Sequence, residues 1–135
     1  MTVGLLLVTH AGIATALVAT ADRMLGRRPL EIATLEVGEA ADPEALAAEA
    51  ERLRAGLDRG DGVLVLTDLY GATPSNVAAR LAGARAVRVV AGVNLPMLVR
   101  VLNYPRLPLE ELAQKALSGG RDGVLLCEPP EAAGG

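Results

Sequence analysis

The segment Gly62–Thr67 is apolar at every position between its ends, and it restricts the fold more than any other feature of the sequence. A strand with one face in water alternates apolar and polar residues, whereas a strand covered on both faces is apolar throughout. We therefore expect this segment to be a central strand of a sheet that carries helices on both faces.

Other apolar runs alternate along the chain with segments of helical periodicity. Strands are predicted at residues 3–8, 30–35, 62–67, 86–91 and 123–127, and helices at residues 12–27, 42–58, 73–82, from about 95 to Asn103, and 109–118. Asp42 with Pro43 makes a strong start for the second helix, and Thr73 with Pro74 is predicted to cap the third.

Strands that alternate with helices at this spacing indicate parallel pairing through right-handed crossovers. The predicted fold is a three-layer, doubly wound α/β domain with a mainly parallel sheet. The domain is expected to span residues 1–127, and residues 128–135 have the composition of a disordered tail.

Composition excludes several classes of function. The 135-residue chain is 51% hydrophobic but has no Trp and no Phe, so stacking on nucleobases cannot be its main activity. A net charge of −3 argues against nucleic-acid or anionic-membrane partners, because both need a basic surface.

The single cysteine, Cys127, excludes an intramolecular disulfide and paired-cysteine zinc sites. The apolar start, Met1–Val8, is too short to span a bilayer. We expect a cytoplasmic protein without metal, cofactor or membrane insertion.

Ligands of doubly wound sheets bind beyond the carboxyl ends of the strands, where the strand order reverses. If the second strand pairs outside the first, and the third pairs on the other side of the first, this switch point lies between the first and third strands. His10 and Asp68 stand just past the ends of these two strands. We therefore expect their side chains to face each other across one crevice.

This pair has the chemistry of phosphoryl transfer through histidine. A neutral imidazole nitrogen can attack a phosphoryl group when the other ring nitrogen carries the proton. A carboxylate that accepts this N–H fixes the tautomer and stabilises the positive charge that develops on attack. We assign His10 and Asp68 as candidate catalytic residues, His10 as the phosphoryl carrier and Asp68 as its orienting partner.

The transferred group also needs hydrogen-bond donors for its equatorial oxygens. The start of the third helix offers backbone N–H groups at Gly71, Ala72 and Thr73, the Thr73 hydroxyl and the positive end of a helix dipole. Gly12, at the start of the first helix, is a further candidate. Each of these residues alone is as readily a turn or capping residue, and their convergence on the predicted switch point is what indicates a site.

Three segments, in order and at their spacing, resemble the IIA domain of the mannose class of the bacterial phosphoenolpyruvate-dependent sugar phosphotransferase system. They are residues 3–10 (Val-Gly-Leu-Leu-Leu-Val-Thr-His), residues 62–76 (Gly-Val-Leu-Val-Leu-Thr-Asp-Leu-Tyr-Gly-Ala-Thr-Pro-Ser-Asn) and residues 92–98 (Gly-Val-Asn-Leu-Pro-Met-Leu). The similarity extends from Thr2 to about Cys127. The family often has Ser-His-Gly and Gly-Gly-Ser-Pro where this chain has Thr-His-Ala and Gly-Ala-Thr-Pro, which keeps a hydroxyl in both places.

The resemblance implies that His10 takes a phosphoryl group from the histidine of the small carrier HPr and passes it to a IIB subunit, with Asp68 as its partner. It implies a homodimer in which a short C-terminal strand can cross to the sheet edge of the neighbouring subunit and pair there in antiparallel orientation. Residues 123–127 fit that strand, although the sequence equally allows them to pair within their own chain. The IIB partner would be a separate protein, and membrane association would occur through IIC and IID subunits.

Two other functions stay open. A regulatory protein would use the same phosphorylation to change its binding targets without sugar transport, and neighbouring genes for IIC and IID subunits would favour transport instead. A flavin- or nucleotide-binding module on the same scaffold is disfavoured, because no Gly-x-Gly-x-x-Gly follows the first strand and no Trp or Phe is present to cover an isoalloxazine ring.

Overall fold

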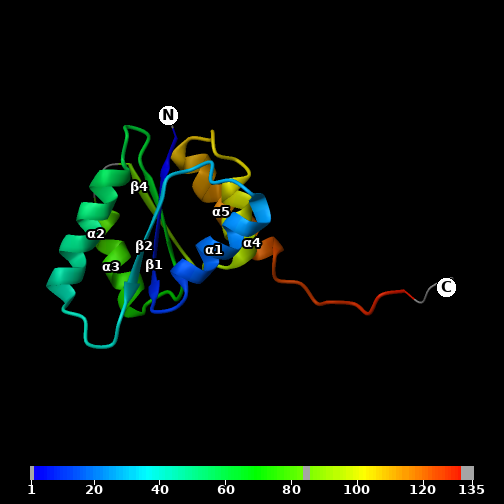
Figure 1. Cartoon of the computed structure of the whole chain (residues 1–135), viewed down its shortest axis with the longest axis horizontal. Coiled ribbons are helices and arrows are strands. Elements are labelled where there is room, and N and C mark those ends of the chain that lie inside the picture. The colour runs from blue at the N-terminus through cyan, green and yellow to red at the C-terminus, as the bar shows by residue number, and fades with distance from the viewer. Residues whose placement is uncertain (1, 84–85, 132–135) are drawn as a thin grey trace.

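Two adjacent strands, β1 (Gly4–His10) and β3 (Val63–Thr67), form the middle of a four-stranded parallel sheet. Figure 1 shows the computed structural model, which describes residues 2–83 and 86–131. β2 (Ile32–Val37) pairs outside β1, and β4 (Val87–Ala91) pairs outside β3, so the strand order is β2-β1-β3-β4. The doubly wound arrangement predicted from the sequence is confirmed, and the switch point falls between β1 and β3.

Helices cover both faces of this sheet (Figure 1). One face carries α1 (Ala14–Leu25), α4 (Leu95–Leu102) and α5 (Leu109–Asp122), and the other carries α2 (Pro43–Leu57) and α3 (Thr73–Leu81). Alternate residues of β1 enter the two cores: Leu5 and Leu7 pack on the α1 side, and Leu6 and Val8 pack on the α2 side. The central strands are therefore apolar on both faces, as predicted. In the described part of the chain, no helix combines the length and apolar character that a membrane span needs.

The predicted boundaries of β2 and α3 need correction. β2 continues to Val37, two residues beyond the prediction, because Glu36 and Val37 pair with Thr9 and His10 of β1. The prediction that Thr73 caps α3 is wrong, because Thr73 is itself the first helical residue and the cap position is taken by an alanine without a side-chain cap bond. The helix begins at residue 73, as predicted, with Pro74 as its second residue, and it ends at Leu81, one residue before the predicted end.

The C-terminal part of the chain differs most from the prediction. α5 runs through Gly119 and Gly120 to Asp122, because these glycines allow close approach to α4 rather than ending the helix. A Cβ atom on Gly119 would lie 2.6 Å from Cβ of Arg100, and one on Gly120 would lie 2.8 Å from Cε of Met97.

The strand predicted at residues 123–127 is not formed within this chain, because α5 uses Asp122 and the segment beyond it leaves the domain (Figure 1). Val124, Leu125 and Leu126 are 76%, 77% and 87% exposed. Of the expected tail, residues 128–131 are exposed without regular secondary structure, and residues 132–135 lie outside the described residues.

Candidate functional site

His10 is the last residue of β1, and Asp68 directly follows the last residue of β3. Because these strands are parallel neighbours, both residues emerge at the same edge of the sheet. Nδ1 of His10 lies 2.7 Å from Oδ2 of Asp68, and the backbone N–H of His10 donates to the same oxygen at 3.1 Å. The structure thus brings together the two side chains that the sequence singled out.

The two partners differ in their exposure to solvent. The side chain of Asp68 is 11% exposed, and that of His10 is 47% exposed. Burial raises the pKa of the Asp68 carboxyl, but hydrogen bonds from the His10 ring and from backbone N–H groups outweigh it and hold this pKa below its usual value. Asp68 is therefore a carboxylate at neutral pH, and an anionic acceptor at Nδ1 keeps the proton of the neutral ring on Nδ1. The Nε2 lone pair is left for an external reactant.

The neighbours of His10 in the sequence hold its backbone in place. Thr9 is fully buried, and its hydroxyl donates to the His10 carbonyl at 2.8 Å and accepts the N–H of Ala14 at 3.0 Å. The turn between β1 and α1 passes through Gly12, whose φ of +90° favours glycine. The Thr9 hydroxyl therefore ties the end of the strand to the start of the helix, so an exposed ring is carried on an ordered backbone.

Glu36 also belongs to this site, and it was not among the residues predicted from the sequence. Its Oε1 accepts the N–H of Gly12 at 3.1 Å, and its Oε2 accepts the N–H of Thr15 at 2.9 Å. Hydrogen bonds from backbone N–H groups, the one from Thr15 more strongly than the one from Gly12, hold the pKa of the Glu36 carboxyl below its usual value. The only signal in the sequence is a single acidic residue in an otherwise uncharged strand. Gly12, a predicted phosphoryl-binding residue, has its N–H occupied by Glu36.

The other predicted phosphoryl-binding residues, Gly71, Ala72 and Thr73, lie at the start of α3. The N–H of Ala72 donates to the carbonyl of Leu69 at 3.2 Å, in a turn that gives Gly71 a φ of +88°. The N–H groups of Gly71 and Thr73 have no acceptor among the described residues. Gly71 and Thr73 are exposed. This helix start is thus open to an anion from solvent.

Asn94 follows β4 at the same edge of the sheet but acts as a structural link. Its Oδ1 accepts the N–H of Met97 and caps α4, and its Nδ2 donates to the carbonyl of Gly120 in α5. Within residues 2–83 and 86–131, no group of three or more His, Cys, Asp or Glu side chains is arranged to hold a metal ion.

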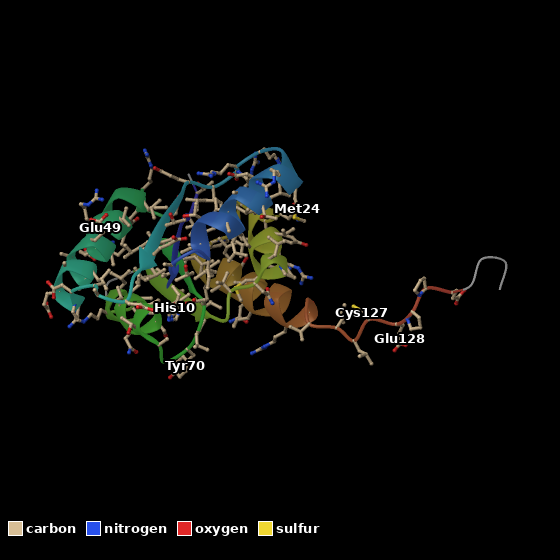
Figure 2. All side chains as sticks on the ribbon, turned by 60° about the horizontal axis from the view of Figure 1, so that its bottom comes forward. His10, Met24, Glu49, Tyr70, Cys127 and Glu128 are labelled. Atoms are coloured by element: carbon tan, nitrogen blue, oxygen red, sulfur yellow. The ribbon has the colours of Figure 1, made fainter. Side chains whose placement is uncertain are left out.

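The loops that follow His10 and Asp68 carry exposed apolar side chains. Leu69 and Tyr70, in the loop after Asp68, are 61% and 87% exposed, and Ile13 is 37% exposed. Figure 2 shows the labelled His10 and Tyr70 at the same end of the molecule. A groove of about 290 Å³ between α1 and α4 adjoins the His10 loop, and Gly12, Ile13, Leu17 and Leu95 line it.

The family described as "PTS system fructose IIA component" (EIIA-man) matches residues 4–116. The chain belongs to this family. The resemblance found in the sequence is thereby confirmed, and it places the protein among the IIA components of the sugar phosphotransferase system.

Individual members of the family give the extent of the similarity. The mannose-specific EIIAB component of Escherichia coli (strain K12) is 33% identical over 138 residues, which cover 98% of this IIA-family chain and 42% of that relative. The mannose/sorbose-specific IIA subunit from Enterococcus faecalis superposes with a TM-score of 0.87 at 27% identity, over 98% of this chain and 99% of that one. The IIA protein associated with the fucose utilization operon of Streptococcus pneumoniae gives a TM-score of 0.72 at 28% identity, over 85% and 88%.

Proposed function

We propose that this IIA-family protein is a phosphoryl carrier, in which Nε2 of His10 accepts the phosphoryl group of phospho-HPr and passes it to a IIB subunit. The observation that carries the proposal is the 2.7 Å contact between His10 Nδ1 and Asp68 at the switch point of the sheet. It leaves Nε2 as the nucleophilic nitrogen on a ring that is 47% exposed. Membership of the family supports a phosphotransfer role in a sugar phosphotransferase system.

The transfer step conserves atoms and charge. The Nε2 lone pair of His10 forms a bond to phosphorus, and the P–N bond to the donor histidine breaks, with its electron pair returning to the donor ring. The His10 ring becomes an imidazolium, and the Asp68 carboxylate stabilises that positive charge. In the second half of the cycle, a nucleophilic group of IIB attacks the same phosphorus, and His10 returns to its neutral form.

The start of α3 is the proposed seat of the phosphoryl oxygens. The N–H groups of Gly71 and Thr73 and the Thr73 hydroxyl are the donors, and the helix dipole favours the negative charge. Ala72 joins them only if its N–H gives up the Leu69 carbonyl. Gly12 joins them only if its N–H gives up Glu36.

The surroundings of His10 fit protein partners better than a small molecule. Exposed apolar side chains beside a reactive group form the kind of surface on which another protein docks. The docking face would comprise Ile13, Leu69 and Tyr70. We place the reaction in the cytoplasm.

The exposed segment 123–127 supports the proposal of a homodimer. Its three consecutive apolar side chains, Val124, Leu125 and Leu126, face solvent, and both edges of the sheet, β2 and β4, are unpaired within the described chain. If this segment paired as a strand with one of the two sheet edges of a second copy, the apolar side chains would be covered and that edge would be paired. Light scattering should give the mass of a dimer for the full chain and of a monomer for a chain that ends at Asp122. A full chain that is monomeric at every concentration would exclude strand exchange.

Phosphorylation of His10 is tested directly by incubation with phosphoenolpyruvate, enzyme I and HPr, followed by intact-mass measurement. The wild-type chain should gain one phosphoryl group that is lost in acid, and His10→Ala should gain none. Omission of HPr controls for direct transfer. A wild-type chain that stays unmodified, or a His10→Ala variant that is modified equally well, contradicts the proposed function.

A further inference from the structure

Two helix starts flank His10, because both central strands of the switch point lead into helices. α1 begins shortly after His10, and α3 begins shortly after Asp68. The positive ends of both helix dipoles therefore lie at the same edge of the sheet. A phosphoryl group on Nε2 carries negative charge on its oxygens, so either helix start would attract it.

At the start of α1, side chains of the protein itself accept the first two N–H groups of the helix. Its first-turn N–H groups at Ala14 and Thr15 donate to the Thr9 hydroxyl and to Oε2 of Glu36. The Gly12 N–H, in the preceding turn, donates to Oε1 of Glu36. Glu36 reaches this position because it lies beside Thr9 in the register of β1 and β2. Its carboxylate stands where a bound anion would otherwise lie.

The start of α3 is left open. The cap residue is Ala72, which offers no side-chain acceptor. The N–H groups of Gly71 and Thr73 have no acceptor within the described part of the chain. Of the two helix starts beside His10, one is thus filled by a carboxylate and the other can accept an anion.

We propose that Glu36 is a positioning residue for phosphoryl transfer. By closing the α1 start with its carboxylate, it directs the phosphoryl oxygens to the start of α3 and holds the Gly12 turn next to His10. The inference rests on the proposed function, because it assigns an orientation to the group that His10 carries. Without Glu36, the phosphoryl group would divide between two sets of donors, and the added contacts at Gly12 and Thr15 would hold it more tightly.

Two substitutions separate the charge of Glu36 from its shape. Glu36→Ala opens both N–H groups, and Glu36→Gln leaves one acceptor oxygen for two donors. We expect onward transfer of the phosphoryl group from phosphorylated protein to slow by about fivefold in Glu36→Ala, in line with the strength of anion contacts at a helix start, and by less in Glu36→Gln. Glu39→Gln is the matched control, because Glu39 is an exposed carboxylate just after β2 and its removal changes the net charge equally.

The decisive measurement is the change in the chemical shifts of the amide protons on phosphorylation, in ¹⁵N-resolved NMR spectra. On phosphorylation of the wild type and of Glu39→Gln, the amides of Gly71 and Thr73 should move downfield, as N–H groups do when they bind phosphate oxygens. The amides of Gly12 and Thr15 should stay near their original positions. In Glu36→Ala, Gly12 and Thr15 should move as well. A role of Glu36 in stability alone would not move these amides on phosphorylation.

Titration of the unmodified proteins with inorganic phosphate repeats the comparison without phosphotransfer. Phosphate should shift Gly12 and Thr15 in Glu36→Ala and not in Glu39→Gln. If HPr leaves the wild type unmodified, the proposed function fails, while this titration still tests Glu36. If Glu36→Ala does not fold, the inference is tested by the amide shifts of the phosphorylated wild type and by the transfer rate of Glu36→Gln. Equal shifts of Gly12 and Gly71 in the phosphorylated wild type, or a transfer rate unchanged in both variants, would overturn the inference.

Discussion

Replacement of Asp68 by asparagine tests the proposed mechanism most directly, because it changes charge with little change in shape. Oδ2 of Asp68 accepts two N–H groups of His10, from the ring at 2.7 Å and from the backbone at 3.1 Å. The backbone N–H cannot become an acceptor, so it favours the oxygen of the new amide in this position. The ring then keeps its proton on Nδ1, and what Asp68→Asn removes is the negative charge.

The size of the effect follows from the geometry of the pair. Unit charges about 4 Å apart attract by about 4 kcal/mol at an effective dielectric constant of about 20. The His10 ring is 47% exposed, so water screens part of this attraction. We take about 2–3 kcal/mol as the loss in transition-state stabilisation, which corresponds to a rate decrease of about 30- to 150-fold at about 1.4 kcal/mol per tenfold change.

The assay is single-turnover phosphorylation by phospho-HPr, followed by quenching and intact-mass measurement. Asp22→Asn is the matched control, because Asp22 pairs with Arg28 on the surface of α1 and its replacement removes the same charge. Thermal unfolding should show that both variants remain folded. The pKa of Asp68 is held below its usual value by hydrogen bonds from His10, so its charge should persist in the wild type to a lower pH than that of an ordinary aspartate.

Two results would refute this reasoning about Asp68. A rate within threefold of wild type would remove its charge from the mechanism. A fall far beyond about 150-fold, with an intact fold, would mean that the ring had changed tautomer and that the amide had turned its NH₂ group toward His10, as can happen when a charged orienting partner is lost. The ¹⁵N shifts of the ring nitrogens distinguish this outcome from loss of charge.

Three further predictions concern stability. Thr67→Val should raise stability by about 1 kcal/mol in urea unfolding, because the fully buried Thr67 hydroxyl has no hydrogen-bond partner in the described structure; a loss of stability would mean that it has one. Gly62→Ala should destabilise the protein by at least about 2 kcal/mol, because φ is +88° and the new Cβ would lie 2.5 Å from the Ala86 carbonyl oxygen. Gly56→Ala is its control: this glycine lies in a helix with open space around it, so the substitution should stabilise the protein by roughly 0.5–1 kcal/mol. The lowered pKa of Glu36 adds stability that is present above its unfolded value of about 4.3 and is lost as the pH falls through the folded value, so the difference in Tm between wild type and Glu36→Gln should shrink in acid.

The strand order and the contact between His10 and Asp68 could be predicted because they rest on patterns that local sequence expresses. Buried parallel strands are apolar runs, and residues just past neighbouring strand ends must meet at one edge. Glu36 has no such signature. Its two partners are backbone N–H groups 24 and 21 residues away in the chain, at Gly12 and Thr15, and backbone donors leave no mark on the sequence. The strand β2 was predicted to end at residue 35, and Glu36 lies just beyond that predicted end.

The errors in the C-terminal region have a different physical origin. Gly119 and Gly120 have low helix propensity and predict the end of α5. The packing of α4 against them overrides that preference, because side chains at both positions would collide with Arg100 and Met97. The segment 123–127 has the pattern of a strand, but a pattern does not say which chain supplies the neighbouring strand. In the structure of one chain, residues 123–127 can therefore be unpaired although their sequence has the pattern of a strand.

A phosphoryl carrier has to release its cargo as readily as it accepts it, and the surroundings of His10 agree with that requirement. In the part of the chain that the structure describes, no Lys or Arg side chain pairs with Asp68 or Glu36, and Arg28, Arg80 and Arg88 pair with carboxylates elsewhere. The proposed oxygen contacts are backbone N–H groups and one hydroxyl, which bind a dianion more weakly than a bidentate arginine does. Tight binding of the phosphorylated state would lower the free energy of the species that must react next, and it would slow the second transfer by the same factor.

On this argument, introduction of an arginine at Thr73 should lengthen the lifetime of phosphorylated His10 and slow the transfer of its phosphoryl group to the acceptor. A chase experiment with unlabelled donor measures both. Faster discharge from Thr73→Arg would show that binding of the phosphoryl oxygens does not limit onward transfer.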